Sequence, residues 1–310
     1  MRNLILRFTM LVLAFTYAVP FYDDMEGSRL LLYGNFEKPF AYRALVPIFS
    51  NFVMWLYPVP FNILPIFIFI VSAVAFVFAF EYLASAFYTG DLELLSISTL
   101  ALFILLFGWP ARWLYDFPTA FFFALGLALL VRGKLLTYLF IFTLSTINRE
   151  TTFLLIPVFM LYTFKRIKLP VWLVYCFAQA VIFSCIQFVI RYHLRDLPGS
   201  PLWFAFYQNL IDYRAHAGLA LLNIFIFAAF LFLVTYGWKS KPEFLRVAFL
   251  CMFPFLFIVF ILFGRAFEYR VFIEAFPAVI LLVLPNMLQR RIQVRAVGAF
   301  NETNTHESQR

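Results

Sequence analysis

The stretch NILPIFIFIVSAVAFVFAFEYLASAFY, residues 62–88, carries one charged side chain, Glu81. A helix that crosses the hydrocarbon core of a bilayer needs about 20 mostly apolar residues. Residues 62–88 meet this requirement and predict a membrane-spanning helix. Glu81 lies near the end of that helix, where we expect it to pair or to reach the interface, and it is assigned no site.

The whole chain shares this apolar character. Its 310 residues are 64% hydrophobic, 22% aromatic and 13% charged, whereas a soluble domain carries about 25% charged residues. The composition excludes a soluble protein and predicts an integral membrane protein. The three cysteines lie in apolar runs without metal-ligand spacing, and the sequence has no dinucleotide-binding, phosphate-loop or zinc-protease motif.

Apolar stretches of this kind recur, and they predict an all-α polytopic bundle of about ten transmembrane helices within residues 1–296. Segment 44–60 is also apolar, but three prolines break it, which predicts an interfacial helix after the first outer loop, residues 23–61. Residues 297–310 read as a polar cytoplasmic tail. The spans are expected at 4–22, 62–88, 93–109, 117–131, 134–148, 150–164, 170–190, 218–237, 243–263 and 270–288.

The positive-inside rule orients this bundle. With both termini in the cytoplasm, 14 of the 24 Lys and Arg residues and six of the 16 acids lie inside. The net charge of +8 then falls on the cytoplasmic face and the outer face is neutral. This basic balance indicates topology and contact with anionic lipid, and it does not indicate nucleic-acid binding.

The charged residues of the outer face lie at the ends of the predicted helices, and nine of the ten outer basic residues are arginine. The arginine fork binds phosphate or carboxylate through two parallel hydrogen bonds. We therefore predict a site for anionic groups at the outer membrane surface. The candidate residues are Asp23, Asp24, Arg43, Arg112, Asp116, Arg149, Glu150, Arg270 and Glu274.

Several of these residues also have a structural explanation. Asp116 precedes Pro118 at a predicted helix start, where an aspartate caps the first turn. Glu150 suits the positive end of a helix dipole and forms an interfacial pair with Arg149 in that interpretation. The remaining outer residues are explained by snorkelling of Arg191 and Arg195 and by structural roles for His193 and His216.

Two clusters are harder to explain structurally. Arg270 and Glu274 are four residues apart, so they share a helical face, and Glu274 lies within an apolar run where an ionised group is costly. Both are expected to face a polar cavity. Asp23 and Asp24 follow the first span directly. Two neighbouring carboxylates raise each other's pKa, which moves a base toward working pH.

A multispanning chain with an acidic first outer loop resembles the GT-C superfamily of membrane glycosyltransferases. The stretches KPFAYRALVPIF, YDFPTAFFFALGLALL, NRETTFLLIPVF and EYRVFIEAFPAVI are similar to segments of bacterial proteins of this kind and of cell-surface polysaccharide assembly. The resemblance covers most of the chain, although its motifs are loose. The larger members have a soluble C-terminal domain that this sequence lacks, which leaves acceptor recognition open.

The resemblance implies an inverting transfer of a sugar from a polyprenyl-phosphate donor, at the extracytoplasmic face of a bacterial inner membrane. Asp23 or Asp24 takes the proton of an acceptor hydroxyl on a glycan, lipid or protein. Arg43, Arg149 and Arg270 hold the lipid phosphate, and Glu150 and Glu274 orient them or bind sugar hydroxyls. Trp109, Trp113 and Tyr115 stack on sugar, frame the lipid entrance or anchor in the aromatic belt.

Two other functions fit part of the pattern. An O-antigen-type polymerase or ligase also uses outer arginines on lipid-linked sugars, but in long outer loops. A transporter or flippase of a lipid-linked or anionic substrate predicts ionisable residues near the midplane and broken helices in paired positions. The transfer itself requires no cofactor, and a divalent metal is compatible with the acids but not demanded by them.

Overall fold

The computed structural model describes residues 2–18, 37–57, 60, 63–107, 113–200, 204–265, 268–287 and 292–294. Of these residues, 81% are helical. Its elements are α1 (Arg2–Ala18), η2 (Phe40–Tyr42), α3 (Leu45–Leu56), α4 (Ile63–Ala84), β1 (Tyr88–Gly90), α5 (Leu92–Phe107), α6 (Asp116–Val131), α7 (Leu135–Asn148), η3 (Glu150–Leu154), α8 (Leu155–Thr163), α9 (Leu169–His193), α10 (Phe206–Ala215), α11 (Ala217–Thr235), η4 (Trp238–Ser240), α12 (Glu243–Phe263), η5 (Tyr269–Phe272), α13 (Phe276–Met287) and β2 (Ile292–Val294).

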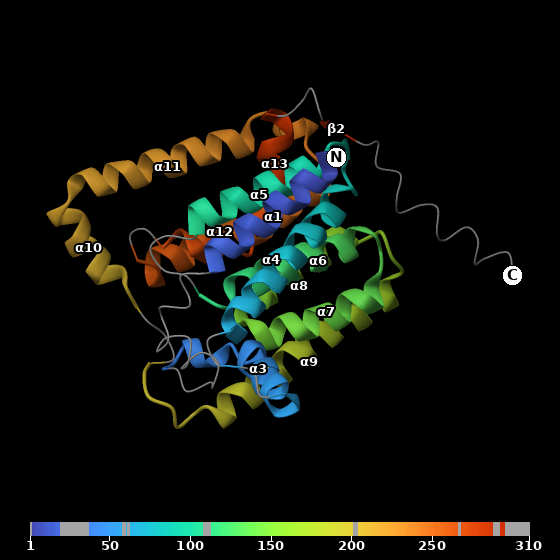
Figure 1. Cartoon of the computed structure of the whole chain (residues 1–310). Coiled ribbons are helices and arrows are strands. Elements are labelled where there is room, and N and C mark those ends of the chain that lie inside the picture. The colour runs from blue at the N-terminus through green and yellow to red at the C-terminus, as the bar shows by residue number, and fades with distance from the viewer. Residues whose placement is uncertain are drawn as a thin grey trace, which may run out of the picture.

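Helix α4 lies at the centre of the bundle, where it packs against α6, α1 and α5 (Figure 1). Beyond α6 follow α7 and α9, and α8 joins this side of the bundle to α12, which in turn packs against α13. Helices α10 and α11 lie on the opposite side from α7 and α9. An apolar sequence favours this arrangement because each helix is hydrophobic on more than one face and packs against several neighbours.

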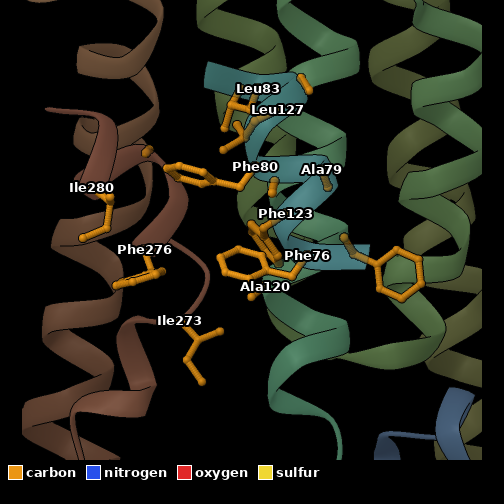
Figure 2. Packing of buried hydrophobic residues seen from close by; sticks show 14 of the residues in the cluster. Phe76, Ala79, Phe80, Leu83, Ala120, Phe123, Leu127, Ile273, Phe276 and Ile280 are labelled. Carbon is orange, nitrogen blue, oxygen red and sulfur yellow. The ribbon is translucent and has the colours of Figure 1, made fainter. Parts of the chain in front are cut away.

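The core is built from aromatic rings of α4, α5, α6 and α13. Phe103 lies at 4.5 Å from Phe117 and 5.4 Å from Phe276 between ring centroids, and Phe76 at 5.5 Å from Phe103. All four side chains are buried. Figure 2 shows Phe76 of α4 among side chains from α6 and α13. Phe117 adjoins Asp116 in the chain, so the aromatic core begins directly beside a predicted site residue.

The structure corrects the predicted number of transmembrane helices. Among the described residues, three helices are long and apolar enough to cross a membrane, namely α4, α9 and α12. The count rises to four if α10 and α11, which meet at 111°, form one broken span. These helices are compatible with a membrane protein. The prediction of about ten spans is nevertheless wrong for this structure.

Helix length explains the difference. An α-helix rises 1.5 Å per residue, so the 16 residues of α6 cover roughly 24 Å and the nine of α8 roughly 14 Å. The hydrocarbon core is about 30 Å thick. Three of the predicted spans, 117–131, 134–148 and 150–164, were already shorter than the required length. Extended Arg149 and the 3₁₀ turns η3 and η5 also shorten the helices that follow.

Two further elements bear on the predicted fold class. Within segment 44–60, residues Leu45–Leu56 form the 12-residue apolar helix α3, which is too short to span a bilayer. Strands β1 and β2 form an antiparallel pair, in which Tyr88 is opposite Val294. This short sheet is a small departure from the predicted all-α fold.

Candidate functional site

Four chain segments place charged side chains at one end of the bundle. Arg43 follows η2, and the backbone N–H of Ala44 donates to the carbonyl of Ile147 at the end of α7, at 3.1 Å. Asp116 begins α6, and Arg149 and Glu150 occupy the break between α7 and η3. The fourth segment, η5 and the turn before α13, carries Glu268, Arg270 and Glu274. We call these seven residues the arginine cluster: Arg43, Asp116, Arg149, Glu150, Glu268, Arg270 and Glu274.

The central contact of the cluster is an ion pair between Arg149 and Glu274. Nε of Arg149 lies 3.0 Å from Oε1 of Glu274, and the two side chains are 9% and 0% exposed. The hydroxyl of Thr151 donates to the same carboxylate oxygen. A buried carboxylate needs such partners to remain ionised. Residues far apart in the sequence therefore form one buried charge pair.

Arg270 and Glu274 were expected to lie on one helical face, but each of them pairs with a different residue. Nε of Arg270 donates to Oε1 of Glu268 at 2.8 Å, and Nη2 donates to the same oxygen. The reason is local geometry, because η5 is a 3₁₀ turn that ends at Phe272, so the four-residue period of an α-helix does not hold there. Glu274 instead turns to Arg149.

Three aromatic rings, which we call the aromatic stack, hold two of the guanidinium groups. Phe40 and Trp113 stack with centroids 4.7 Å apart, and Trp113 and Tyr115 with centroids 5.6 Å apart. The guanidinium carbon of Arg43 lies 3.9 Å from the Tyr115 centroid, and that of Arg270 lies 4.7 Å from the Trp113 centroid. A ring face stabilises a cation at these distances. Buried Tyr115 therefore serves the cluster and not an aromatic belt.

Burial and neighbouring charges shift two arginines in opposite directions. Burial, and then the charge of Arg149, lower the pKa of Arg43. Burial also lowers the pKa of Arg149, but Glu274 and Glu150 outweigh it, and the net pKa of Arg149 is raised. A guanidinium remains cationic across either shift. The cluster thus holds three cations among four carboxyl groups.

Asp116 does not cap its helix. Helix α6 begins at Asp116 itself, and no side chain caps its first turn by a hydrogen bond. The carboxyl group is fully buried, and neither oxygen has a hydrogen-bond partner among the described residues. Burial raises its pKa to about 6, although Arg270, Arg149 and Arg43 oppose the shift. The capping explanation for Asp116 therefore fails in this structure.

Other buried polar atoms of the cluster are also without a hydrogen bond in the described part of the chain. They include donors and acceptors, and a native protein leaves few such atoms unpaired. A ligand or water that bonds to several of them at once is the ordinary explanation. The atoms are Nε of Arg43, Nη1 of Arg149, Nη1 of Arg270, Oε2 of Glu150 and Oε2 of Glu274.

A layer of buried hydroxyl and amide groups supports the cluster, and sequence reasoning did not identify it. Nδ2 of Asn148 donates to Oγ1 of Thr119 at 3.0 Å, and Ser145 and Thr152 share a hydrogen bond of 2.7 Å. These bonds fix the break that carries Arg149. The signal was present in STINRETT, residues 145–152, a polar run between apolar segments.

The remaining predicted residues lie elsewhere. Asp23, Asp24, Arg112 and Trp109 are outside the described residues. Arg191 stacks on Tyr42 at 5.2 Å and is exposed. His193 and His216 bond to backbone carbonyls four residues earlier. Within the described ranges, no group of three His, Cys, Asp or Glu side chains could hold a metal ion.

No family model matches this sequence, and searches of the curated proteins and of the solved structures find no match either. Function is therefore inferred from the arginine cluster and the aromatic stack.

Proposed function

We propose that the protein is a membrane glycosyltransferase that moves a sugar from a polyprenyl-phosphate donor to an acceptor hydroxyl. The observation that carries this proposal is the set of buried polar atoms without hydrogen bonds, within the described residues, around three arginines, of which Arg149 is buried and Arg43 and Arg270 are partly buried. The guanidinium group binds a phosphate through two parallel N–H···O hydrogen bonds. The neighbouring carboxylates and aromatic faces suit the hydroxyls and the apolar faces of a sugar ring.

In the proposed reaction, the acceptor oxygen attacks the anomeric carbon of the donor sugar. The bond between that carbon and the phosphate oxygen breaks, and polyprenyl phosphate leaves with the electron pair. Arg149 and Arg270 stabilise the charge that develops on the leaving phosphate, as an oxyanion hole does for its oxygen. The proton of the acceptor passes to Asp23 or Asp24, which the sequence predicts as the base.

The setting of this reaction is part of the proposal. The cytoplasmic termini and the extracytoplasmic site follow from the distribution of Lys and Arg along the sequence. Two cytoplasmic termini require an even number of spans, which is met when α10 and α11 form one broken span. A tag at the C-terminus that is found outside the cell contradicts this orientation. The acceptor is a glycan, a lipid or a protein of the cell envelope.

The first experiment measures binding of a long-chain polyprenyl monophosphate to the protein in lipid nanodiscs. We expect Arg149→Met to weaken binding at least tenfold, because a lost guanidinium removes charge-assisted hydrogen bonds. Arg191→Met is the matched control, since Arg191 is exposed and stacks on Tyr42. Equal affinity in both variants, or no binding by the unmodified protein, contradicts the proposed function.

The second experiment follows consumption of a radiolabelled polyprenyl-phosphate sugar by Asp23→Asn and Asp24→Asn. One of these variants should lose transfer while it remains folded and still binds polyprenyl monophosphate. Full activity in both variants rejects the assignment of the base. A donor that crosses the bilayer of a vesicle intact, without being consumed, favours the transporter instead.

A further inference from the structure

The arginine cluster leaves both donors and acceptors without partners in one buried place. Arg149 already pairs with Glu274, Arg270 pairs with Glu268, and Arg43 stacks on Tyr115. Asp116 is fully buried beside these arginines and has no hydrogen bond to any of them. Within the described chain, the residues of the cluster therefore leave some of their possible hydrogen bonds unmade, although groups of opposite charge lie nearby.

These donors and acceptors without partners limit which chemical groups a bound ligand can carry. Phosphate oxygens accept hydrogen bonds and satisfy the free guanidinium N–H groups, but a phosphate dianion cannot satisfy Asp116, since both are acceptors. A hydroxyl group donates a hydrogen bond and satisfies a carboxylate without adding charge. A molecule that carries hydroxyls next to a phosphate, as a sugar phosphate does, satisfies both kinds of atom.

The surrounding charges indicate a neutral sugar. Glu150 and Glu274 each keep one oxygen without a hydrogen bond in the described part of the cluster, so Asp116 is not the cluster's only acceptor without a partner. A uronic acid would bring another carboxylate beside these acids, and like charges at short range repel. Hydroxyl donors meet no such repulsion.

We propose that Asp116 accepts a hydrogen bond from a hydroxyl of the donor sugar and selects neutral, hydroxylated sugars. This inference rests on the proposed function, and it assigns Asp116 to the sugar while the arginines hold the phosphate. Asp116 thereby determines specificity through contact with the substrate. A site built to bond a substrate hydroxyl rejects the analogue that lacks it, because the buried polar group is then left unpaired.

The test compares polyprenyl-phosphate hexoses in which each hydroxyl is replaced in turn by hydrogen. For the unmodified protein, we expect kcat/KM to fall about 100-fold or more for one of these deoxy donors. Asp116→Asn should use the parent donor more slowly. In this variant, kcat/KM for the same deoxy donor should be less than about tenfold below that for the parent donor. Binding of polyprenyl monophosphate, which has no sugar, should not weaken in this variant, because the substitution removes a negative charge near the arginines that hold the phosphate.

Asp196→Asn is the matched control, because Asp196 is an aspartate with an 88% exposed side chain. Its preference among the donors should equal that of the unmodified protein. Equal use of every deoxy donor by the unmodified protein overturns the inference, even if Asp116→Asn does not fold. An undiminished preference in folded Asp116→Asn overturns it too, whereas the absence of polyprenyl monophosphate binding refutes the proposed function instead.

Discussion

Two Arg–Glu ion pairs of nearly equal length lie at opposite ends of the helical bundle. Nε of Arg149 is 3.0 Å from Glu274, and Nη2 of Arg166 is 2.9 Å from Glu243. Exposure separates them, since the first pair is 9% and 0% exposed and the second is 30% and 64% exposed. A solvated pair contributes little to folding, whereas a buried pair has lost the hydration of both ions.

The polar partners at the two ends differ as well. At the end of the bundle that contains Arg166, Arg132 donates to the carbonyl of Tyr82 at 2.6 Å, and Lys241 donates to the carbonyl of Val234 at 2.6 Å. These cations complete the hydrogen bonds of helix ends. In the arginine cluster, buried donors and acceptors stay open in the described part of the chain. The contrast supports the proposal that the arginine cluster binds a ligand, whereas the cations at the opposite end complete backbone hydrogen bonds.

The largest effect is expected when Arg149 is removed. Arg149→Met leaves Glu274 buried without its cation and should lower the free energy of unfolding by about 3–5 kcal/mol. Thermal unfolding in detergent measures this change. The double variant Arg149→Met, Glu274→Leu should recover most of the loss but none of the binding of polyprenyl monophosphate. Recovery of binding in the double variant would show that the pair is structural only.

Asp116→Asn is expected to have the next largest effect, and its sign is opposite. The folded state raises the pKa of Asp116 from 3.8 to about 6, so it holds the proton more tightly than the unfolded chain does. The stability from this group is complete below pH 3.8 and is lost as the pH rises through about 6.

At about pH 8, Asp116→Asn should therefore be more stable than the unmodified protein by on the order of 3 kcal/mol. Below about pH 4 the two proteins should unfold alike. Unfolding curves across this range, with Asp196→Asn as the exposed control, measure the difference. A stability difference that does not change with pH contradicts the burial of an unpaired carboxyl group.

Arg270→Lys should have a smaller effect, confined to binding. Lysine keeps the charge but lacks the planar fork, which pairs with Glu268 and lies over Trp113. Losing one parallel hydrogen bond weakens affinity for polyprenyl monophosphate by about tenfold. Titration in nanodiscs checks this value, and an unchanged affinity would place the phosphate away from Arg270.

The smallest effect is expected at the exposed pair. Arg166→Met should change the free energy of unfolding by less than about 1 kcal/mol, because water solvates Glu243 once the pair is gone. Added salt should reduce even this difference. A loss as large as that of Arg149→Met would remove the distinction between the two ends.

Local sequence was a good guide to the residues of the cluster and a poor guide to their contacts. Arg43, Arg149 and Arg270 were chosen because arginine suits phosphate, and the structure brings them together. Glu274 was expected beside Arg270 by helical spacing, but a 3₁₀ turn directs it to Arg149. Asp116 was equally compatible with a cap, and only its burial and open hydrogen bonds separate the two explanations.

Composition by itself determined that the chain is apolar and suited to a membrane, since hydrophobicity sums over residues wherever they lie. The order of the residues also determined where charge is concentrated along the chain. Only the tertiary structure decided how long each helix runs and which charges meet. Helix length depends on where backbone hydrogen bonds stop, and the pairing of Arg149 with Glu274 depends on packing between segments separated by more than a hundred residues.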